Sequence, residues 1–316
     1  MTDRPVVGPP DASRVPRYTE PATFARLPRI DQVTDADVCI VGIPFDCGAH
    51  PVRVGARLGP TAIREQSALL RPFNPPEFDF DPLQRLQVAD WGDVDVVPGR
   101  IEDAFEKIER VIGAVLDSGA LPLTMGGDGA VTLPQLRAVH RKFPALAVLH
   151  IDSHTDSNPS PETGHDTGTT FTRAAQERLV DTSHSLHVGA HGTFRMAGIL
   201  QTADSLGYET ITMSELDEMG IPRLHERIRA RCGTRPVYLC FDMDVFDPSC
   251  APGVCAPSWG GLTAREGFRI LRGLAGLNIV AIDVNTISPP HDVGGMSALL
   301  AGNVMLEGML LFLQRG

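Results

Sequence analysis

Short apolar runs alternate with longer amphipathic stretches along most of the chain, beginning near residue 37. The apolar runs predict strands at residues 38–44, 86–89, 121–125, 147–151, 185–189, 210–213, 237–241 and 279–282. The stretches between them predict helices at residues 61–70, 101–118, 133–142, 171–179, 223–231, 264–272 and 296–314. Helical spacing is clearest in the second of these, in Phe105, Ile108, Val111, Ile112 and Val115.

This alternation of strand and helix is typical of a parallel sheet covered by helices on both faces. The sequence contains no internal repeat, low-complexity tract or linker that would divide it. We therefore expect one doubly wound α/β domain over residues 37–316. The Pro-rich residues 1–36 before it are expected to form an irregular arm on the surface.

Composition narrows the possible partners. The chain has 316 residues and a formal net charge of −11, and 42% of its positions are hydrophobic. This length is sufficient for one large core, and the acidic balance argues against nucleic acid or an anionic membrane as the main partner. No secretory signal is evident at the N-terminus. A segment that spans a bilayer needs ~18 apolar residues. The longest apolar run, residues 305–313, is too short and contains Glu307. We expect a cytoplasmic protein.

The six cysteines include no C-x-x-C pair. Cys39 and Cys240 lie inside predicted strands, where a reduced core thiol is the usual interpretation. Cys250 and Cys255 lie in a predicted loop, so a redox or metal-binding role stays open as a less favoured alternative.

Polar residues follow the fourth predicted strand, where ligands of parallel sheets usually bind. If the strand continued past residue 151, Asp152, His154 and Asp156 would share one face. Asp242 and Asp244 follow the strand at 237–241 with the same spacing.

These five oxygen and nitrogen ligands suit one or two hard or borderline cations such as Mn²⁺ or Ni²⁺. Two such cations would activate water for hydrolysis. Each motif alone is equally consistent with helix caps or turn residues, but their occurrence after two strands favours a metal site. Asp247, directly before Pro248, is interpreted as a turn residue.

At the level of motifs, the sequence resembles the ureohydrolases, which include arginase, agmatinase and guanidinobutyrase, from about residue 16 to its end. The agmatinase/guanidinobutyrase branch is the more similar. The matching segments are residues 55–60, 126–128, 152–156, 168–171, 241–244, 251–253, 260–263 and 288–290.

The resemblance implies an arginase/deacetylase-like α/β fold and a binuclear site, usually with manganese and in some members nickel. Asp152 and Asp242 would bridge both metals. His154 and Asp244 would complete one site, and Asp156 would belong to the other. Relatives in this branch are commonly trimers or hexamers that release urea from guanidino compounds.

Three positions depart from the family pattern. Gly129 stands where the family has a metal-binding histidine, and Thr167 stands where it has a second histidine. Thr286 replaces a carboxylate placed against the substrate guanidinium, whose charged hydrogen bonds contribute ~1.5–3 kcal/mol. Threonine cannot act as a base near neutral pH. His165, two residues before Thr167, is a candidate to compensate.

Three hypotheses follow. The favoured one is a catalytically degenerate subunit in a hetero-oligomer with an intact ureohydrolase paralogue, as in the two-subunit biguanide hydrolases of the metformin-cleaving kind. The second is an active hydrolase with one metal at Asp152, His154, Asp242 and Asp244 that acts on a small guanidino or amide compound. The third is a binding protein without catalysis.

Overall fold

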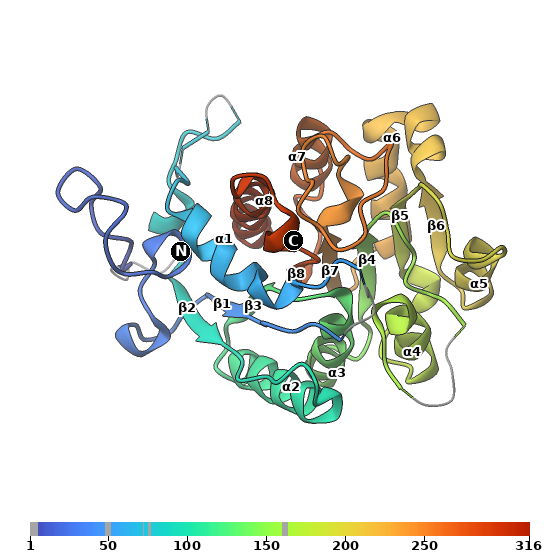
Figure 1. Ribbon diagram of the computed structural model, residues 1–316, viewed down its shortest axis with the longest axis horizontal. Helices are drawn as coiled ribbons and strands as arrows, with labels where there is room; N and C mark the ends of the chain where they lie inside the picture. The colour runs from blue at the N-terminus through green and yellow to red at the C-terminus, as the bar shows by residue number, and fades with distance from the viewer. Residues whose placement is uncertain (1–5, 48–51, 72, 75–76, 160–163) are drawn as a thin grey trace.

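The computed structural model describes residues 6–47, 52–71, 73–74, 77–159 and 164–316. Its centre is a parallel sheet of eight strands in the order β2-β1-β3-β8-β7-β4-β5-β6 (Figure 1). The strands are β1 (Val38–Gly42), β2 (Val88–Asp93), β3 (Leu121–Met125), β4 (Ala147–Ile151), β5 (Leu186–Ala190), β6 (Glu209–Thr212), β7 (Val237–Asp242) and β8 (Ile279–Asn285).

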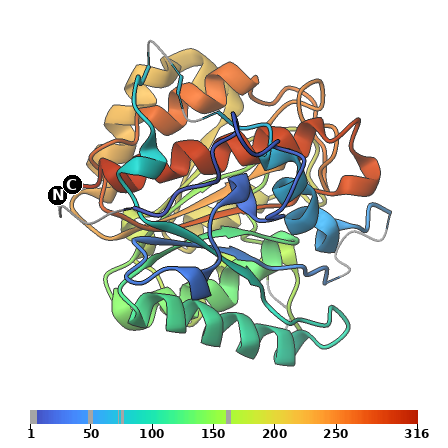
Figure 2. The ribbon, with the colours of Figure 1, turned by 90° about the vertical axis from the view of Figure 1, so that its left-hand side faces the viewer.

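Helices cover both faces of this sheet (Figures 1 and 2). One face carries α2 (Ile101–Asp117), α3 (Thr132–Lys142) and α4 (Thr170–Gln176). The opposite face carries α1 (Gly59–Ser67), α6 (Met213–Cys232), α7 (Ala264–Arg272) and α8 (Met296–Leu313). The short α5 (Ile199–Ser205) lies beside β6 at the edge of the sheet. The predicted α/β class with a single parallel sheet is confirmed.

The central strand β7 shows why the sequence pattern was readable. Val237, Leu239 and Phe241 pack into the core under α6, α7 and α8, whereas Tyr238 and Cys240 pack into the core on the α2–α3 side. Because both faces are covered, successive side chains are all buried and the strand reads as a continuous apolar run.

Helix α8 is an 18-residue apolar segment, longer than the run that we expected from the sequence. By length and composition alone it could cross a membrane, but 67% of it is buried inside the structure. It packs against α1, α7 and β8, and Glu307 accepts a hydrogen bond from Arg272 Nε at 2.9 Å. These contacts are those of a core helix.

Two helices differ most from the sequence prediction. Helix α6 begins at Met213, ten residues before the predicted start, and its backbone breaks at Gly220, where φ is 74°. A capping box formed by Thr212 and Glu215 starts it. Helix α5 was not predicted, because its seven residues include only a short apolar pattern.

The N-terminal segment is irregular, with single 3₁₀ turns at Phe24–Arg26 and Ile30–Gln32. It is not confined to the surface as expected, because Phe24 and Leu27 are fully buried in the core. The Phe24 amide also donates to Asp90 Oδ2 at 2.8 Å. This part of the arm therefore belongs to the packed domain.

Candidate metal centre

The two acidic motifs meet because β4 and β7 are neighbouring strands, with Ile151 paired to Phe241. Their carboxyl ends open into a cavity of about 740 Å³, a size typical of small-molecule sites. The cavity is lined by Asp152, His154, Thr155, Asp156, Asn158, Asp166, Thr167, Gly168, Thr193, Phe194, Arg195, Ile199, Asp242, Asp244 and Thr286. All five predicted ligands are in this set.

The geometry that brings them together is not the continued strand that the spacing suggested. Strand β4 ends at Ile151, and Asp156 has a left-handed backbone with φ of 44°. Asp242 is the last residue of β7, and Asp244 lies in the 3₁₀ turn Met243–Val245. Tight turns rather than strand alternation therefore direct these side chains into the cavity.

One compact ligand group consists of Asp152, His154 and Asp244, whose ligand atoms all lie within 4.8 Å of one another. His154 Nδ1 is 3.3 Å from Asp152 Oδ1 and 3.8 Å from Asp244 Oδ2. Ser153 Oγ donates to Asp244 Oδ1 at 2.9 Å, which orients that carboxylate toward the group.

The electrostatics of the cluster favour a bound cation. Burial and the charge of Asp152 raise the pKa of Asp242 to about 6. The same two causes raise the pKa values of Asp156 and Asp244 well above the ordinary range. Buried like charges this close are unfavourable unless a positive charge compensates them. The donor set therefore fits a hard or borderline divalent metal ion.

Position 129 faces the Asp156 side of this cluster. A Cβ at Gly129 would lie 3.2 Å from Asp156 Oδ2 and 3.6 Å from Asp242 Oδ1. It would also lie only 2.8 Å from Thr167 Cγ2. Gly129 therefore offers no ligand on this side of the centre, where the potential ligand atoms are those of Asp152, Asp156 and the buried His150. The Thr167 methyl group lies where a side chain at position 129 would begin.

Thr286 forms another wall of the cavity and supplies no charge. Its φ of 69° is unusual for a β-branched residue. Two hydrogen bonds hold it there. Its hydroxyl donates to the Asn285 carbonyl oxygen at 2.7 Å and accepts from the Met243 amide at 3.1 Å.

His165 is not brought to the carboxylates. Its ring packs on Phe105 of α2, with centroids 4.9 Å apart, and it is absent from the residues that line the cavity. The compensation suggested for His165 is not supported by this placement. Asp247 behaves as predicted, because its side chain accepts from the Ser249 and Gly260 amides of a turn.

The loop thiols form no disulfide in this structure. Neither Cys250 nor Cys255 is joined to another cysteine. In the described part of the chain, neither joins a group of potential metal ligands.

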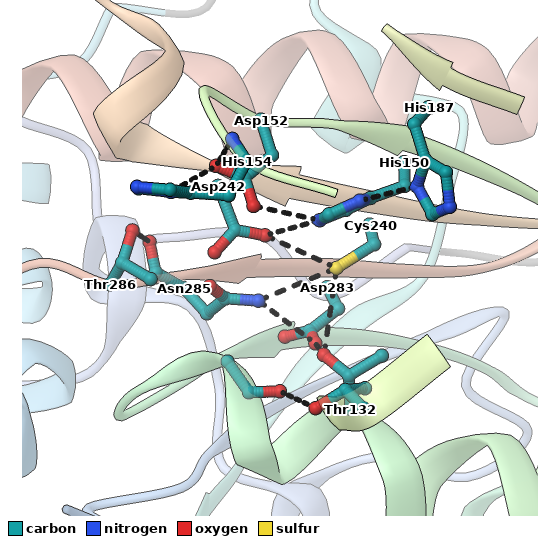
Figure 3. Close-up of polar contacts among 12 residues, drawn as sticks. Thr132, His150, Asp152, His154, His187, Cys240, Asp242, Asp283, Asn285 and Thr286 are labelled. Atoms are coloured by element: carbon teal, nitrogen blue, oxygen red, sulfur yellow. Dashed lines mark hydrogen bonds and ion pairs between the residues drawn. The ribbon is translucent and has the colours of Figure 1, made fainter. Parts of the chain in front are cut away.

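Sequence reasoning missed the rim residues Asn158, Phe194 and Arg195. The last two follow β5, so inspecting every strand end would have found them. It also missed a buried polar row one layer beneath the cavity (Figure 3). This row crosses five neighbouring strands at one register, through Thr124, Asp283, Cys240, His150 and His187.

His150 connects this row to the cluster. Its Nε2 is 3.1 Å from Asp152 Oδ2 and 3.2 Å from Asp242 Oδ2. Burial alone lowers the pKa of His150, but the two carboxylates outweigh burial and raise the pKa to about 10. At the other end of the row, Asp283 accepts hydrogen bonds from Thr132 and Thr124 at 2.6 and 2.9 Å.

Comparison with known proteins agrees with this geometry. The arginase family model matches residues 36–311. The chain is 36% identical over 305 residues to a guanidinopropionase of Pseudomonas aeruginosa, covering 96% of this chain and 95% of that protein. It is 37% identical over 297 residues to an agmatinase of Neisseria meningitidis, covering 92% of each.

Solved structures give the same result. Proclavaminate amidinohydrolase from Streptomyces clavuligerus superposes with a TM-score of 0.90 at 33% identity, over 95% of this chain and 99% of that one. A formiminoglutamase of Trypanosoma cruzi solved with Mn²⁺ superposes with a TM-score of 0.82 at 27% identity, over 94% and 100% of the two chains. With a family match over most of its length and the expected acidic centre at the ends of β4 and β7, the chain belongs to the arginase family of ureohydrolases.

Proposed function

We propose that this chain is a catalytically degenerate, supporting subunit of a metal-dependent C–N hydrolase that releases urea from a guanidino or biguanide compound. Its partner would be an intact paralogue in a trimeric or hexameric hetero-oligomer. The observation that carries the proposal is Gly129, which faces Asp156 and Asp242 without offering a ligand.

Substituting a residue that only hydrogen-bonds to a metal ligand costs ~10–100-fold in metal affinity. Losing a residue that binds the metal directly should cost more. The Asp156 side of the centre, where Asp156 lies with His150 and Asp152, would therefore hold a metal more weakly than it would with a ligand at position 129. Asp152, His154 and Asp244 still form a group that could hold one ion. Metal ions bound in such a centre supply a Lewis acid and an activated water.

Thr167 and Thr286 do not supply the remaining functions. Thr167 lines the cavity where a base would be needed, and its hydroxyl does not accept protons near neutral pH. Thr286 offers a neutral hydroxyl that is already used by the backbone. A guanidinium placed against this wall would lack a charged hydrogen-bond acceptor from Thr286.

A specific observation favours a second candidate, an active single-metal hydrolase for a guanidino carboxylic acid. Arg195 is the one arginine or lysine among the described lining residues, and it lies on an exposed loop after β5. A carboxylate at the far end of a substrate could pair with it. The similar guanidinopropionase acts on a guanidino acid, as its name states.

The deciding experiment measures metal content and urea release for the chain alone and after co-expression with an intact paralogue from the same source. Substrates would include agmatine, 3-guanidinopropionate, 4-guanidinobutyrate and a dimethylated biguanide. The proposal expects co-purification of the two chains, with urea released only by the mixed oligomer. Failure to co-purify would overturn it, and turnover by the chain alone would support the second candidate.

A matched pair of variants sharpens this test. In the mixed oligomer, Asp244→Asn in this chain should leave most of the activity, whereas the equivalent change in the paralogue should abolish it. The reverse result would place catalysis in this chain.

A third outcome is a rise in thermal stability when a candidate substrate is added, without turnover by the chain alone or by the mixed oligomer. That outcome would indicate a binding protein.

A further inference from the structure

We propose that His150, Cys240 and Asp242 form a distinct, softer ligand set beneath the carboxylate cluster, which takes Zn²⁺ or another thiophilic divalent transition-metal ion. The three residues are buried, and their ligand atoms all lie within 4.8 Å of one another. Thiolate and imidazole donors select Zn²⁺ and related ions over Mn²⁺, which prefers oxygen.

Sheet register creates this set. His150 on β4 pairs directly with Cys240 on β7. Cys240 and Asp242 are two residues apart on the same strand, so their side chains share a face. The thiol therefore lies under one of the carboxylates that line the cavity (Figure 3).

Two of the three donor spacings are compatible with a metal site, and the third lies within 4.8 Å. His150 Nε2 is 3.2 Å and Cys240 Sγ is 3.4 Å from the same Asp242 Oδ2 atom. Around a tetrahedral Zn²⁺, with bonds of about 2.0 Å to nitrogen and 2.3 Å to sulfur, ligand atoms lie roughly 3.2–3.8 Å apart. Asp152 Oδ2, 3.1 Å from His150 Nε2, is available as a fourth donor.

A histidine that binds a metal must be neutral, and hydrogen bonds set the tautomer that neutral His150 would adopt. Ser157 Oγ donates to the Thr155 carbonyl oxygen at 3.0 Å, so it accepts from His187 Nε2 at 3.2 Å. Neutral His187 then has an unprotonated Nδ1, which accepts from His150 Nδ1 at 2.9 Å. His150 thus keeps its Nδ1 proton in this bond, and its Nε2 is the atom directed at Asp242. Metal-binding histidines are commonly oriented by such a bond from the other ring nitrogen.

A second observation concerns Asn285, which contacts this ligand set through its amide nitrogen. Asn285 is fully buried, and its Oδ1 atom has no hydrogen-bond partner. Its Nδ2 atom donates to Asp283 Oδ2 at 3.2 Å and contacts Cys240 Sγ at 3.5 Å. Asn285 pairs with Asp242 in the sheet register and lies beneath it in Figure 3. An orphaned buried carbonyl beside a carboxylate is unfavourable unless a positive group satisfies it.

Because Asp242 belongs to both ligand sets, a thiophilic ion here would draw that carboxylate away from the cavity. The inference concerns ion choice and does not depend on the proposed hydrolysis. It holds whether or not the chain turns over a substrate.

The test loads metal-free protein with Co²⁺, because a cobalt–thiolate bond gives a near-ultraviolet charge-transfer band that oxygen and nitrogen ligands do not give. We expect this band in the unmodified chain and its loss in Cys240→Ser. The matched control, Cys255→Ser, removes another buried thiol near the site and should keep the band. We also expect Cys240→Ser to weaken Zn²⁺ binding by at least ~10-fold, with Mn²⁺ binding changed by less than about two-fold.

Stoichiometric Co²⁺ binding without the band, or a band that survives Cys240→Ser, would overturn the proposal. X-ray absorption of the Zn²⁺-loaded unmodified chain provides a check that needs no variant. It should show one sulfur at about 2.3 Å, and a shell of oxygen and nitrogen alone would refute the site. Both measurements detect binding, so their failure is separable from any result on urea release.

Discussion

Introducing a histidine at position 129 should add a ligand on the Asp156 side of the metal centre, provided that the Thr167 methyl group moves or is removed. The backbone at Gly129 has no positive φ, so a side chain is compatible with its conformation. The obstacle is steric. The new Cβ would lie 2.8 Å from Thr167 Cγ2, well inside the ~3.5–4.0 Å preferred by carbon atoms.

The Thr167→Ser change removes this methyl group and keeps the hydroxyl. The double variant Gly129→His/Thr167→Ser should therefore bind its second Mn²⁺ more tightly than the unmodified chain. Outer-shell changes alter metal affinity by ~10–100-fold, and a direct ligand should contribute at least that much. A gain of ~10–100-fold corresponds to about 1.4–2.7 kcal/mol of binding free energy. Gly129→His alone should gain less, because the Thr167 methyl group must first move.

Equilibrium dialysis against Mn²⁺, with metal measured per chain, provides the assay. Gly129→Ala/Thr167→Ser is the control, because it adds the Cβ without the imidazole. Circular dichroism would establish that each variant is folded. A folded double variant that binds the second Mn²⁺ no more tightly than this control would refute the reasoning that position 129 faces the Asp156 side of the centre.

Three further predictions use other parts of the structure. Asp244→Asn should weaken the binding of the first metal ion by at least ~10-fold in the same dialysis assay, whereas Asp247→Asn, in the turn after β7, should leave metal binding unchanged. Arg64→Ala should lower the free energy of unfolding, measured in urea, by about 3–5 kcal/mol. The reason is that Asp90, whose side chain is 1% exposed, would lose both of its 2.9 Å hydrogen bonds to the guanidinium. A loss below about 1 kcal/mol would count against a buried ion pair. Burial raises the pKa of Asp128 from 3.8 to about 6, so the folded state holds this proton longer than the unfolded state and stability should fall as pH rises from about 4 to about 6. In thermal unfolding of metal-free protein, the stability of Asp128→Asn should depend less on pH in that window than the stability of the unmodified chain. An unchanged pH dependence would contradict the raised pKa of Asp128.

The sequence by itself determined that the chain forms a parallel sheet, and it located the strands along the chain. Strands such as β7 are buried on both faces, so their apolar character is continuous and easily read. It also placed the acidic motifs at strand ends, because polar residues that interrupt such runs mark where the chain leaves the core. The sequence therefore contained the ligand types of the centre, although not their arrangement.

Only the tertiary structure decided which residues meet. The neighbouring positions of β4 and β7 bring Asp152 to Asp242, although 90 residues separate them in the chain. The contact between Thr167 and Gly129 likewise depends on how two distant loops pack, and His165 lies against α2 for the same reason.

The buried row beneath the cavity makes this point most clearly. His150 is the one polar residue of β4, and Cys240 lies in the apolar run of β7 before Asp242, so neither residue carries a signal of its partner. Register alone sets them side by side. Strand pairing is decided by the packing of whole elements, so local sequence patterns specify which face a residue takes but not which residue lies opposite.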